Sequence, residues 1–215
     1  MNWQLISFFG DSTVLLPSAA ALFIVLMLRK TSRLLAWQWS LLFGITGAIV
    51  CASKLAFMGW GLGIRELDYT GFSGHSALSA AFWPIFLWLL SARFSVGLRK
   101  AAVITGYVLA AVVGYSRLVI HAHSVSEVIA GLLLGAAGSA LFLVLQKRTS
   151  DPESVNISWG GVAWFHLSFY IAVAKRRLSP CWDKSPPRWG RWINPLRVPI
   201  CTSRPGNRHL FYRGN

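Results

Sequence analysis

Long runs of hydrophobic residues follow one another along the chain, and short polar connections separate them. The runs lie near residues 12–28, 34–53, 75–92, 101–119 and 124–146. About 20 consecutive apolar residues are needed for a helix to cross the hydrocarbon core of a bilayer. Since each run approaches that length, the pattern predicts an all-α fold, a multi-pass transmembrane helical bundle.

The last third of the chain decides the number of spans. Residues 158–174 form one more apolar run, which we expect to be a sixth span, with an interfacial helix as the alternative. The basic segment after it is rich in Pro, Arg and Trp and is expected to be poorly ordered. We therefore predict five to six spans, with a transmembrane core over residues 1–150 and the sixth helix and tail over residues 151–215.

The composition agrees with a membrane protein. Hydrophobic residues make up 54% of the chain and charged residues 13%, whereas a soluble domain carries about a quarter charged residues. The net charge of +14 does not indicate a nucleic-acid-binding protein, because the basic residues lie in short loops and in the tail. The three cysteines lack the spacing of a metal site, and neither a metal nor a cofactor is expected.

The loops between the runs also predict an orientation. Of the lysines and arginines in residues 1–150, eight fall on one side of the bundle and three on the other. The side with more basic residues is expected to be cytoplasmic. The periplasmic face then receives three cations, three histidines and one glutamate: Lys54, Arg65, Arg117, His75, His121, His123 and Glu127.

The segment SRLVIHAHSVSE, residues 116–127, contains charged and titratable side chains within an otherwise apolar region. Charged groups at bilayer depth are costly and are usually functional. His123 and Glu127 are four residues apart and therefore share one face of a helix. A carboxylate that accepts the proton of Nδ1 leaves Nε2 of the imidazole free to act as a nucleophile. This pair is the predicted centre of the chemistry.

Two further features indicate an anionic ligand. Uncompensated cations near a membrane surface require a negatively charged partner, and the planar guanidinium group of arginine suits phosphate oxygens. The segment GFSGHSA, residues 71–77, opens the third apolar run through Ser73 and Gly74. Amide groups at a helix N-terminus bind anions, and glycine lets a ligand approach the backbone closely.

The three clusters resemble the signature of the type-2 phosphatidic acid phosphatase superfamily, which includes membrane lipid phosphatases, soluble acid phosphatases and vanadium haloperoxidases. In the third part of that signature Ser-Arg is followed by five residues, His, three residues and Asp. Here Ser116 and Arg117 are followed at the same spacing by His123 and Glu127. Glutamate thus replaces aspartate, which keeps the carboxylate and lengthens its reach.

The other two parts of the signature also have counterparts. The second part, Pro-Ser-Gly-His, corresponds to the segment Phe72 to His75, in which Phe72 replaces the proline. The first part contains a lysine and an arginine, for which Lys54 and Arg65 stand. Ten residues separate these two instead of six, and Glu66 stands where a proline would follow. The resemblance covers about residues 50–135.

The resemblance implies a metal-independent phosphatase. His123 would attack phosphorus and form a phosphohistidine, Glu127 would orient His123, and His75 would protonate the leaving group. The equatorial oxygens of the phosphoryl group would be held by three cations, a hydroxyl and an amide. These belong to Lys54, Arg65, Arg117, Ser73 and Gly74. The predicted function is hydrolysis of a phosphomonoester or pyrophosphate of a membrane lipid.

Two other functions fit the same residues. A non-catalytic membrane protein that binds or translocates anionic lipid would use the cations but would not need His75, His123 and Glu127 together. A vanadate-dependent peroxidase is not expected in a membrane-embedded chain of this length. The predicted partners are a lipid phosphate and the membrane, and the predicted location is the inner membrane. The identity of the lipid and the oligomeric state are left open.

Overall fold

A computed structural model describes residues 3–64, 66 and 68–149 of the chain. Arg65, the predicted sixth span over residues 158–174 and the basic tail lie outside the described residues. The described part is helical, and its only β-type pairing is an isolated antiparallel bridge between Ile64 and Tyr69. The prediction of an all-α fold is therefore confirmed for this part of the chain.

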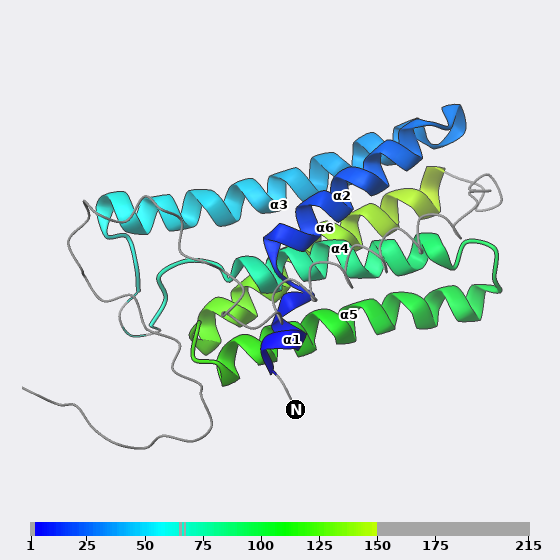
Figure 1. The fold of residues 1–215 in the computed structure, drawn as a ribbon. Helices are drawn as coiled ribbons and strands as arrows, with labels where there is room; N and C mark the ends of the chain where they lie inside the picture. The colour runs from blue at the N-terminus through cyan, green and yellow to red at the C-terminus, as the bar shows by residue number, and fades with distance from the viewer. Residues whose placement is uncertain (1–2, 65, 67, 150–215) are drawn as a thin grey trace, which may run out of the picture. The chain divides into compact units, whose positions relative to one another are not determined.

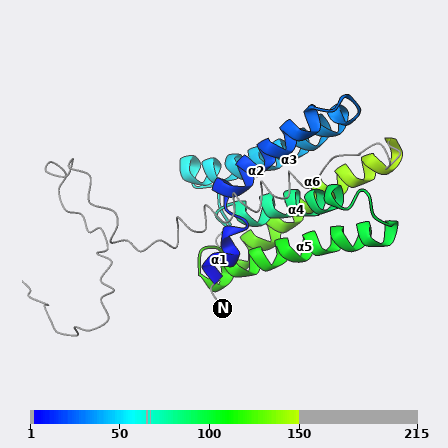
Figure 2. The same cartoon turned by 45° about the vertical axis from the view of Figure 1, so that its right-hand side comes forward.

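Six α-helices and one short 3₁₀ helix make up the described residues (Figure 1). They are α1 (Trp3–Phe8), α2 (Ser12–Met27), η1 (Lys30–Ser32), α3 (Arg33–Trp60), α4 (Gly74–Leu90), α5 (Val96–Val119) and α6 (Val125–Thr149). Each of the five apolar runs coincides with one of the helices α2 to α6. The helices α3 to α6 lie side by side with their axes in a similar direction (Figures 1 and 2).

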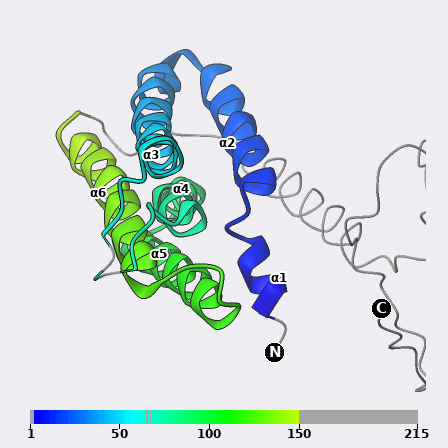
Figure 3. The same ribbon diagram turned by 90° about the vertical axis from the view of Figure 1, so that its left-hand side faces the viewer.

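Four segments are long and apolar enough to cross a membrane: Trp3–Met27, Lys30–Trp60, Val96–Val119 and Val125–Lys147. The remaining predicted span, which is α4, has 17 residues. At 1.5 Å per residue it is about 25 Å long. This helix is shorter than α3, α5 and α6, and it lies in the middle of the bundle, where α2, α3, α5 and α6 all contact it (Figure 3).

The core of the bundle is built around α4. Twelve of its 17 residues are buried, including Phe82, Trp83 and Phe86. The ring of Phe82 also contacts Trp39 and Phe43 of α3. Because residues on all faces of α4 are apolar and enclosed, the helix lacks the polar stripe of a surface helix.

Glycines allow α6 to pack closely against α4. A Cβ atom added to Gly131 would lie 2.7 Å from the carbonyl oxygen of Ser73, and one added to Gly135 would lie 2.1 Å from that of Ala77. These separations are shorter than any real Cβ contact, so only glycine fits at either position. The small-xxx-small pair that Gly131 and Gly135 form is thus used for packing inside the bundle rather than as a dimer face.

The outward faces of the helices are also apolar. Leu41 of α3, Ile104 of α5 and Leu133 of α6 are each more than 60% exposed. A bundle with an apolar interior and an apolar exterior is stable in hydrocarbon, where no water solvates the outer face. The described part of the chain is therefore that of a membrane protein.

The N-terminal helix α1 joins the bundle beside α5. The Asp11 carboxylate caps α2 by accepting a hydrogen bond of 3.0 Å from the amide of Thr13. The connection between α1 and α2 is fixed to α4, since the indole of Trp83 donates to the carbonyl oxygen of Phe9 at 3.2 Å. A Cβ atom on Gly10 would lie 3.2 Å from the carbonyl oxygen of His75. The chain near residue 10 therefore lies directly against the start of α4.

The close packing of α6 on α4 predicts that one methyl group added at Gly135 lowers the stability of the protein. Gly135→Ala should force the two helices apart and lower the stability by about 1–3 kcal/mol, as is typical of overpacked cores. Thermal unfolding in detergent would measure the loss. The matched control is Gly44→Ala on α3, where an added Cβ meets nothing within 4 Å, and this variant should be neutral or slightly stabilised. Equal melting temperatures for the two variants would contradict the close α4–α6 contact.

Candidate functional site

The candidate site lies at one end of the bundle, where α3 and α5 end and α4 and α6 begin (Figure 1). The antiparallel order of the helices brings these four termini together. The three clusters singled out in the sequence are thereby gathered at a single end.

His123 and Glu127 form a direct pair. The Nδ1 atom of His123 lies 2.6 Å from Oε2 of Glu127. His123 belongs to the loop between α5 and α6, and Glu127 lies in the first turn of α6. The negative charge near a helix N-terminus is favourable, because the helix dipole is positive at that end. With Nδ1 engaged by the carboxylate, Nε2 is the ring nitrogen that remains for chemistry.

Glu127 also holds the loop between α3 and α4. Its second oxygen, Oε1, accepts hydrogen bonds from the amide of Thr70 at 2.9 Å and from the Thr70 hydroxyl. Its backbone carbonyl accepts a bond of 3.1 Å from the amide of Ser73. Burial and the charge of Glu127 together raise the pKa of the neighbouring Tyr69. Although Glu127 is only 5% exposed, its carboxylate is satisfied, as a buried charge must be.

The start of α4 presents backbone amides. Ala77 donates the first bond of the helix, to the carbonyl oxygen of Ser73, so the amides of Gly74, His75 and Ser76 precede the hydrogen-bonded turns. The buried Ser73 hydroxyl accepts a bond of 3.0 Å from the Ser76 hydroxyl and does not cap the helix itself. A helix end with amides of this kind suits an anion.

Arg117 extends from the last turn of α5. Its Nη1 donates a hydrogen bond of 2.7 Å to the hydroxyl of Ser7 in α1. Its Nε is buried and has no protein partner within the described residues. The carboxylate of Asp11 also acts electrostatically on this guanidinium. The short N-terminal helix therefore positions the arginine, which is half-buried.

His75 lies among the charged groups of the site. Asp11, Lys54, Arg117 and His123 all act electrostatically on its imidazole. Interactions between charges are screened over about 10 Å at ordinary ionic strength, so these groups belong to one neighbourhood. The structure thus brings together side chains from α3, α4, α5, the connection between α1 and α2, and the loop before α6.

Lys54 lies on α3 and is exposed. The loop after α3 folds back on it at Gly71, whose φ of +142° is disfavoured for other residues. A Cβ atom there would also lie 3.2 Å from Oγ of Ser53 and 3.4 Å from Cγ of Lys54. The Ser53 hydroxyl accepts a bond of 3.3 Å from the amide of Phe72. Arg65, the second predicted cation of this segment, lies outside the described residues.

Four polar residues of the site were not predicted from the sequence: Ser7, Asp11, Ser53 and Thr70. Asp11 had a detectable signal, because it is the only acidic residue before Glu66 in a predominantly apolar region. The other three are neutral hydroxyl residues, which occur throughout the chain, and only the tertiary structure distinguishes them. Among the described residues no group of three or more His, Cys, Asp or Glu is arranged to hold a metal ion.

The arrangement has defined chemical capacities. An imidazole oriented by a carboxylate, a second imidazole and two cations surround a helix N-terminus. Cations and amides stabilise negative charge on oxygen, and an oriented imidazole supplies a nucleophile or a base. These capacities suit transfer of an anionic group such as phosphoryl.

Comparisons with known proteins point in the same direction. The family described as the PAP2 superfamily matches residues 57–151. The chain is also similar to an uncharacterised 22.5 kDa protein in the cps region of Klebsiella pneumoniae. The two are 98% identical over 163 residues, which are 76% of this chain and 78% of that protein. No solved structure matches the chain.

The hydrogen bond between Glu127 and Thr70 in the loop before α4 predicts how fast the amide hydrogen of Thr70 exchanges with solvent. Glu127→Ala should speed exchange of the Thr70 amide on the order of 10-fold or more, since hydrogen bonds to charged groups contribute about 1.5–3 kcal/mol. Hydrogen–deuterium exchange of peptides covering residues 66–73 would measure this. Glu66→Ala removes an exposed carboxylate from the same loop and should leave exchange unchanged. Equal rates in the two variants would show that Glu127 does not hold the loop.

Proposed function

Because the chain belongs to the PAP2 superfamily, whose membership supports a phosphatase-type hydrolase, we propose that it removes phosphate from a membrane lipid. The proposed substrate carries a phosphomonoester or a pyrophosphate, and the proposed intermediate is a phosphohistidine. The observation that carries this proposal is the 2.6 Å contact between Nδ1 of His123 and the Glu127 carboxylate, within the neighbourhood of His75 and Arg117.

The proposed reaction begins at Nε2 of His123. The Nε2 lone pair attacks phosphorus, and the bond between phosphorus and the leaving oxygen breaks. His75 gives its proton to that oxygen, so the alcohol or phosphate leaves in its protonated form. Glu127 holds the Nδ1 proton and stabilises the positive charge that the ring of His123 acquires.

Hydrolysis of the intermediate completes the cycle. A water molecule attacks the phosphorus of the phosphohistidine, the bond to Nε2 breaks, and His75 takes a proton from that water. Inorganic phosphate is released, and both imidazoles return to their starting states. The same residue serves as acid in the first step and as base in the second, as microscopic reversibility requires.

The proposed phosphate site uses the surrounding donors. Arg117, Lys54 and the amides at the start of α4 are suited to the equatorial oxygens, on which negative charge gathers as the phosphoryl group transfers. Ser73, Gly74 and Arg65 keep the roles that the resemblance implies. With these groups present, the proposed reaction needs no metal ion or other cofactor.

A lipid substrate is supported by the position of the site. The site lies at the end of a bundle whose outer faces are apolar, and we propose that this end lies at the depth where headgroups meet the hydrocarbon core. We propose the inner membrane as the location, with the site facing the periplasm. The supporting observation is that more lysines and arginines lie in the loops at the opposite end, eight against three.

The central prediction concerns the nucleophile. His123→Ala should abolish phosphate release from a panel of lipid phosphates, because it removes the nucleophile of the proposed reaction. Glu127→Asp should retain appreciable activity, since it keeps a carboxylate near Nδ1. Detergent-purified protein and a colorimetric phosphate assay are sufficient. The matched control is His121→Asn, two residues earlier, where φ is +53° and asparagine is tolerated; it should keep full activity.

The same experiment separates the leading function from lipid binding without catalysis. A protein that only binds or translocates anionic lipid would be stabilised by the panel but would release no phosphate in any variant. Unchanged turnover by the His123 variant would reject the proposed mechanism. Loss of activity in the His121 control would mean that the loop, rather than the imidazole of His123, is what the reaction requires.

A second prediction concerns the support of Arg117. Ser7→Ala removes the acceptor of the 2.7 Å bond from Nη1. It should lower kcat/KM about fivefold or more, because a typical hydrogen bond contributes about 1 kcal/mol. Inhibition by vanadate, which mimics five-coordinate phosphorus, should weaken by a similar factor. The control is Ser12→Ala, which changes an exposed serine at the start of α2. If Ser12→Ala lowered kcat/KM and weakened vanadate inhibition as much as Ser7→Ala does, a specific role for Ser7 would be contradicted.

A further inference from the structure

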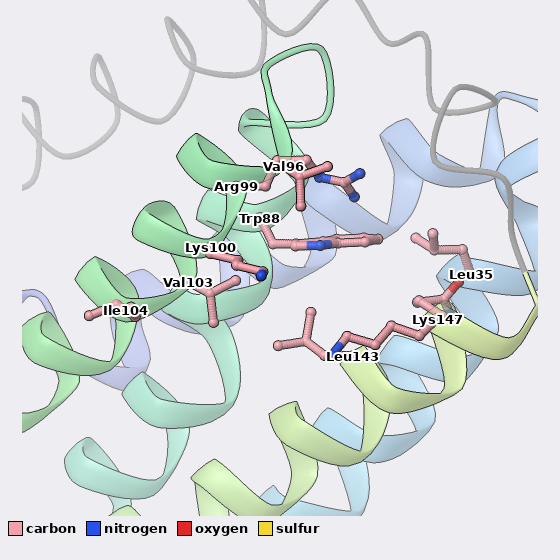
Figure 4. Close-up of a pocket in the computed structure, with 10 residues that line it drawn as sticks. Leu35, Trp88, Val96, Arg99, Lys100, Val103, Ile104, Leu143 and Lys147 are labelled. Carbon is pink, nitrogen blue, oxygen red and sulfur yellow. The ribbon is translucent and has the colours of Figure 1, made fainter.

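A cavity lies at the end of the bundle opposite to the candidate functional site. It has a volume of about 610 Å³ and is lined by residues of α3, α4, α5 and α6, including Leu35, Trp88, Val103 and Leu143 (Figure 4). Its walls come from the start of α3 and α5 and from the end of α4 and α6. The candidate functional site occupies the opposite termini of the same helices. The two sites are therefore separated by about the length of α4, roughly 25 Å.

Cations stand around this apolar cavity. Arg99 and Lys100 of α5 and Lys147 of α6 belong to its lining, and the two lysine side chains extend toward the same space from opposite helices (Figure 4). No acidic side chain of the described residues lines it. A cavity with apolar walls and a positive rim is complementary to an amphiphile with a negative head.

Arg99 is held in place by an aromatic ring. Its guanidinium carbon lies 4.6 Å from the centre of the Trp88 ring, which is the geometry of a cation–π interaction. Its Nε is buried and has no protein partner within the described residues. The arginine is thus fixed at the cavity, and its charge is not neutralised there by a described carboxylate.

The cavity is continuous with the lipid-facing surface. Val96 and Ile104, which also line it, are 68% and 62% exposed. An apolar chain can therefore enter from the side of the bundle, within the hydrocarbon, while a headgroup remains at the level of the lysines. Long basic side chains at helix ends reach the headgroup layer in this way. A water-soluble phosphate would use only the rim and leave the apolar walls empty.

We propose that this cavity binds an anionic phospholipid of the leaflet opposite to the proposed catalytic site. Its phosphate would lie among Arg99, Lys100 and Lys147, and one acyl chain would lie along Trp88, Val103 and Leu143. This site is independent of the proposed phosphatase reaction, since none of its residues belongs to the candidate functional site. It is a structural lipid site, in which the bound molecule is retained and not converted.

Native mass spectrometry of the full-length protein tests the proposal. The probes are phosphatidylglycerol, which is anionic, and phosphatidylcholine, which is zwitterionic, each added to delipidated protein. We expect retention of phosphatidylglycerol in preference to phosphatidylcholine. The double variant Lys100→Gln, Lys147→Gln should weaken phosphatidylglycerol binding on the order of 30-fold, because each basic residue near an anionic headgroup contributes about a factor of five.

Two matched controls keep the result specific. The double variant Arg29→Gln, Lys30→Gln removes the same charge from exposed positions at the same end of the bundle and should leave binding unchanged. Val103→Trp fills the cavity and should abolish binding, whereas Val108→Trp, on the exposed face of the same helix, should not. Phosphate release should persist in all four variants, which also reports that they are folded.

Several outcomes would overturn the proposal. Equal loss in the two charge variants would show that only the general positive charge of this end attracts the lipid. Displacement of the lipid by glycerol phosphate alone would show that the apolar walls contribute nothing. Absence of any retained lipid in the unsubstituted protein would mean that another part of the chain or a second copy fills the cavity.

Discussion

The close approach of α6 to α4 is the contact on which the rest of the structure depends. His123, Glu127, Gly131 and Gly135 follow one another at intervals of four residues and so lie along one side of the chain as it enters and forms α6. The two glycines bring that side against the backbone of α4 at Ser73 and Ala77. The carboxylate of Glu127 is then delivered to the start of α4, and the imidazole is delivered beside it. The residues that pack α6 against α4 and the residues of the candidate functional site thus lie on the same side of this segment.

The hydrogen bonds of Glu127 extend this contact to a third element. One oxygen orients His123 and the other holds Thr70, while the backbone carbonyl receives the amide of Ser73. The Glu127 carboxylate therefore both holds the loop before α4 and interacts electrostatically with His123. The longer side chain of glutamate, compared with aspartate, allows it to reach two partners on different segments.

Much of the fold was predictable because hydrocarbon imposes a simple rule on sequence. Apolar runs of a given length become helices, and each of the five runs coincides with one. The central place of α4 was less apparent, since a buried helix and a lipid-facing helix have similar composition. Its richness in Ser, Ala and aromatic residues, from Ser76 to Phe86, is explained only by neighbours on every side.

Some residues of the candidate functional site could likewise be predicted from the sequence, and others could not. Charged side chains such as Arg117 and Glu127 are conspicuous against an apolar background, and their pairing with His123 follows from helical spacing. Ser7 and Thr70 act through hydroxyl groups that come near the site from distant segments, and no local pattern marks such residues. Asp11 lies between these cases, because its charge is rare in this region while its effect on His75 depends on how the chain turns between α1 and α2.

The modest length of α4 brings the two ends of one helix to two different sites. Its 17 residues are accompanied by the 24 of α5, a difference of roughly 10 Å along the axis. At its C-terminal end, α4 contributes Trp88 to the cavity that lies between the longer helices α3, α5 and α6. At its N-terminal end, α4 begins at the candidate functional site. One short central helix thus connects the two places at which this protein is proposed to bind an anionic group.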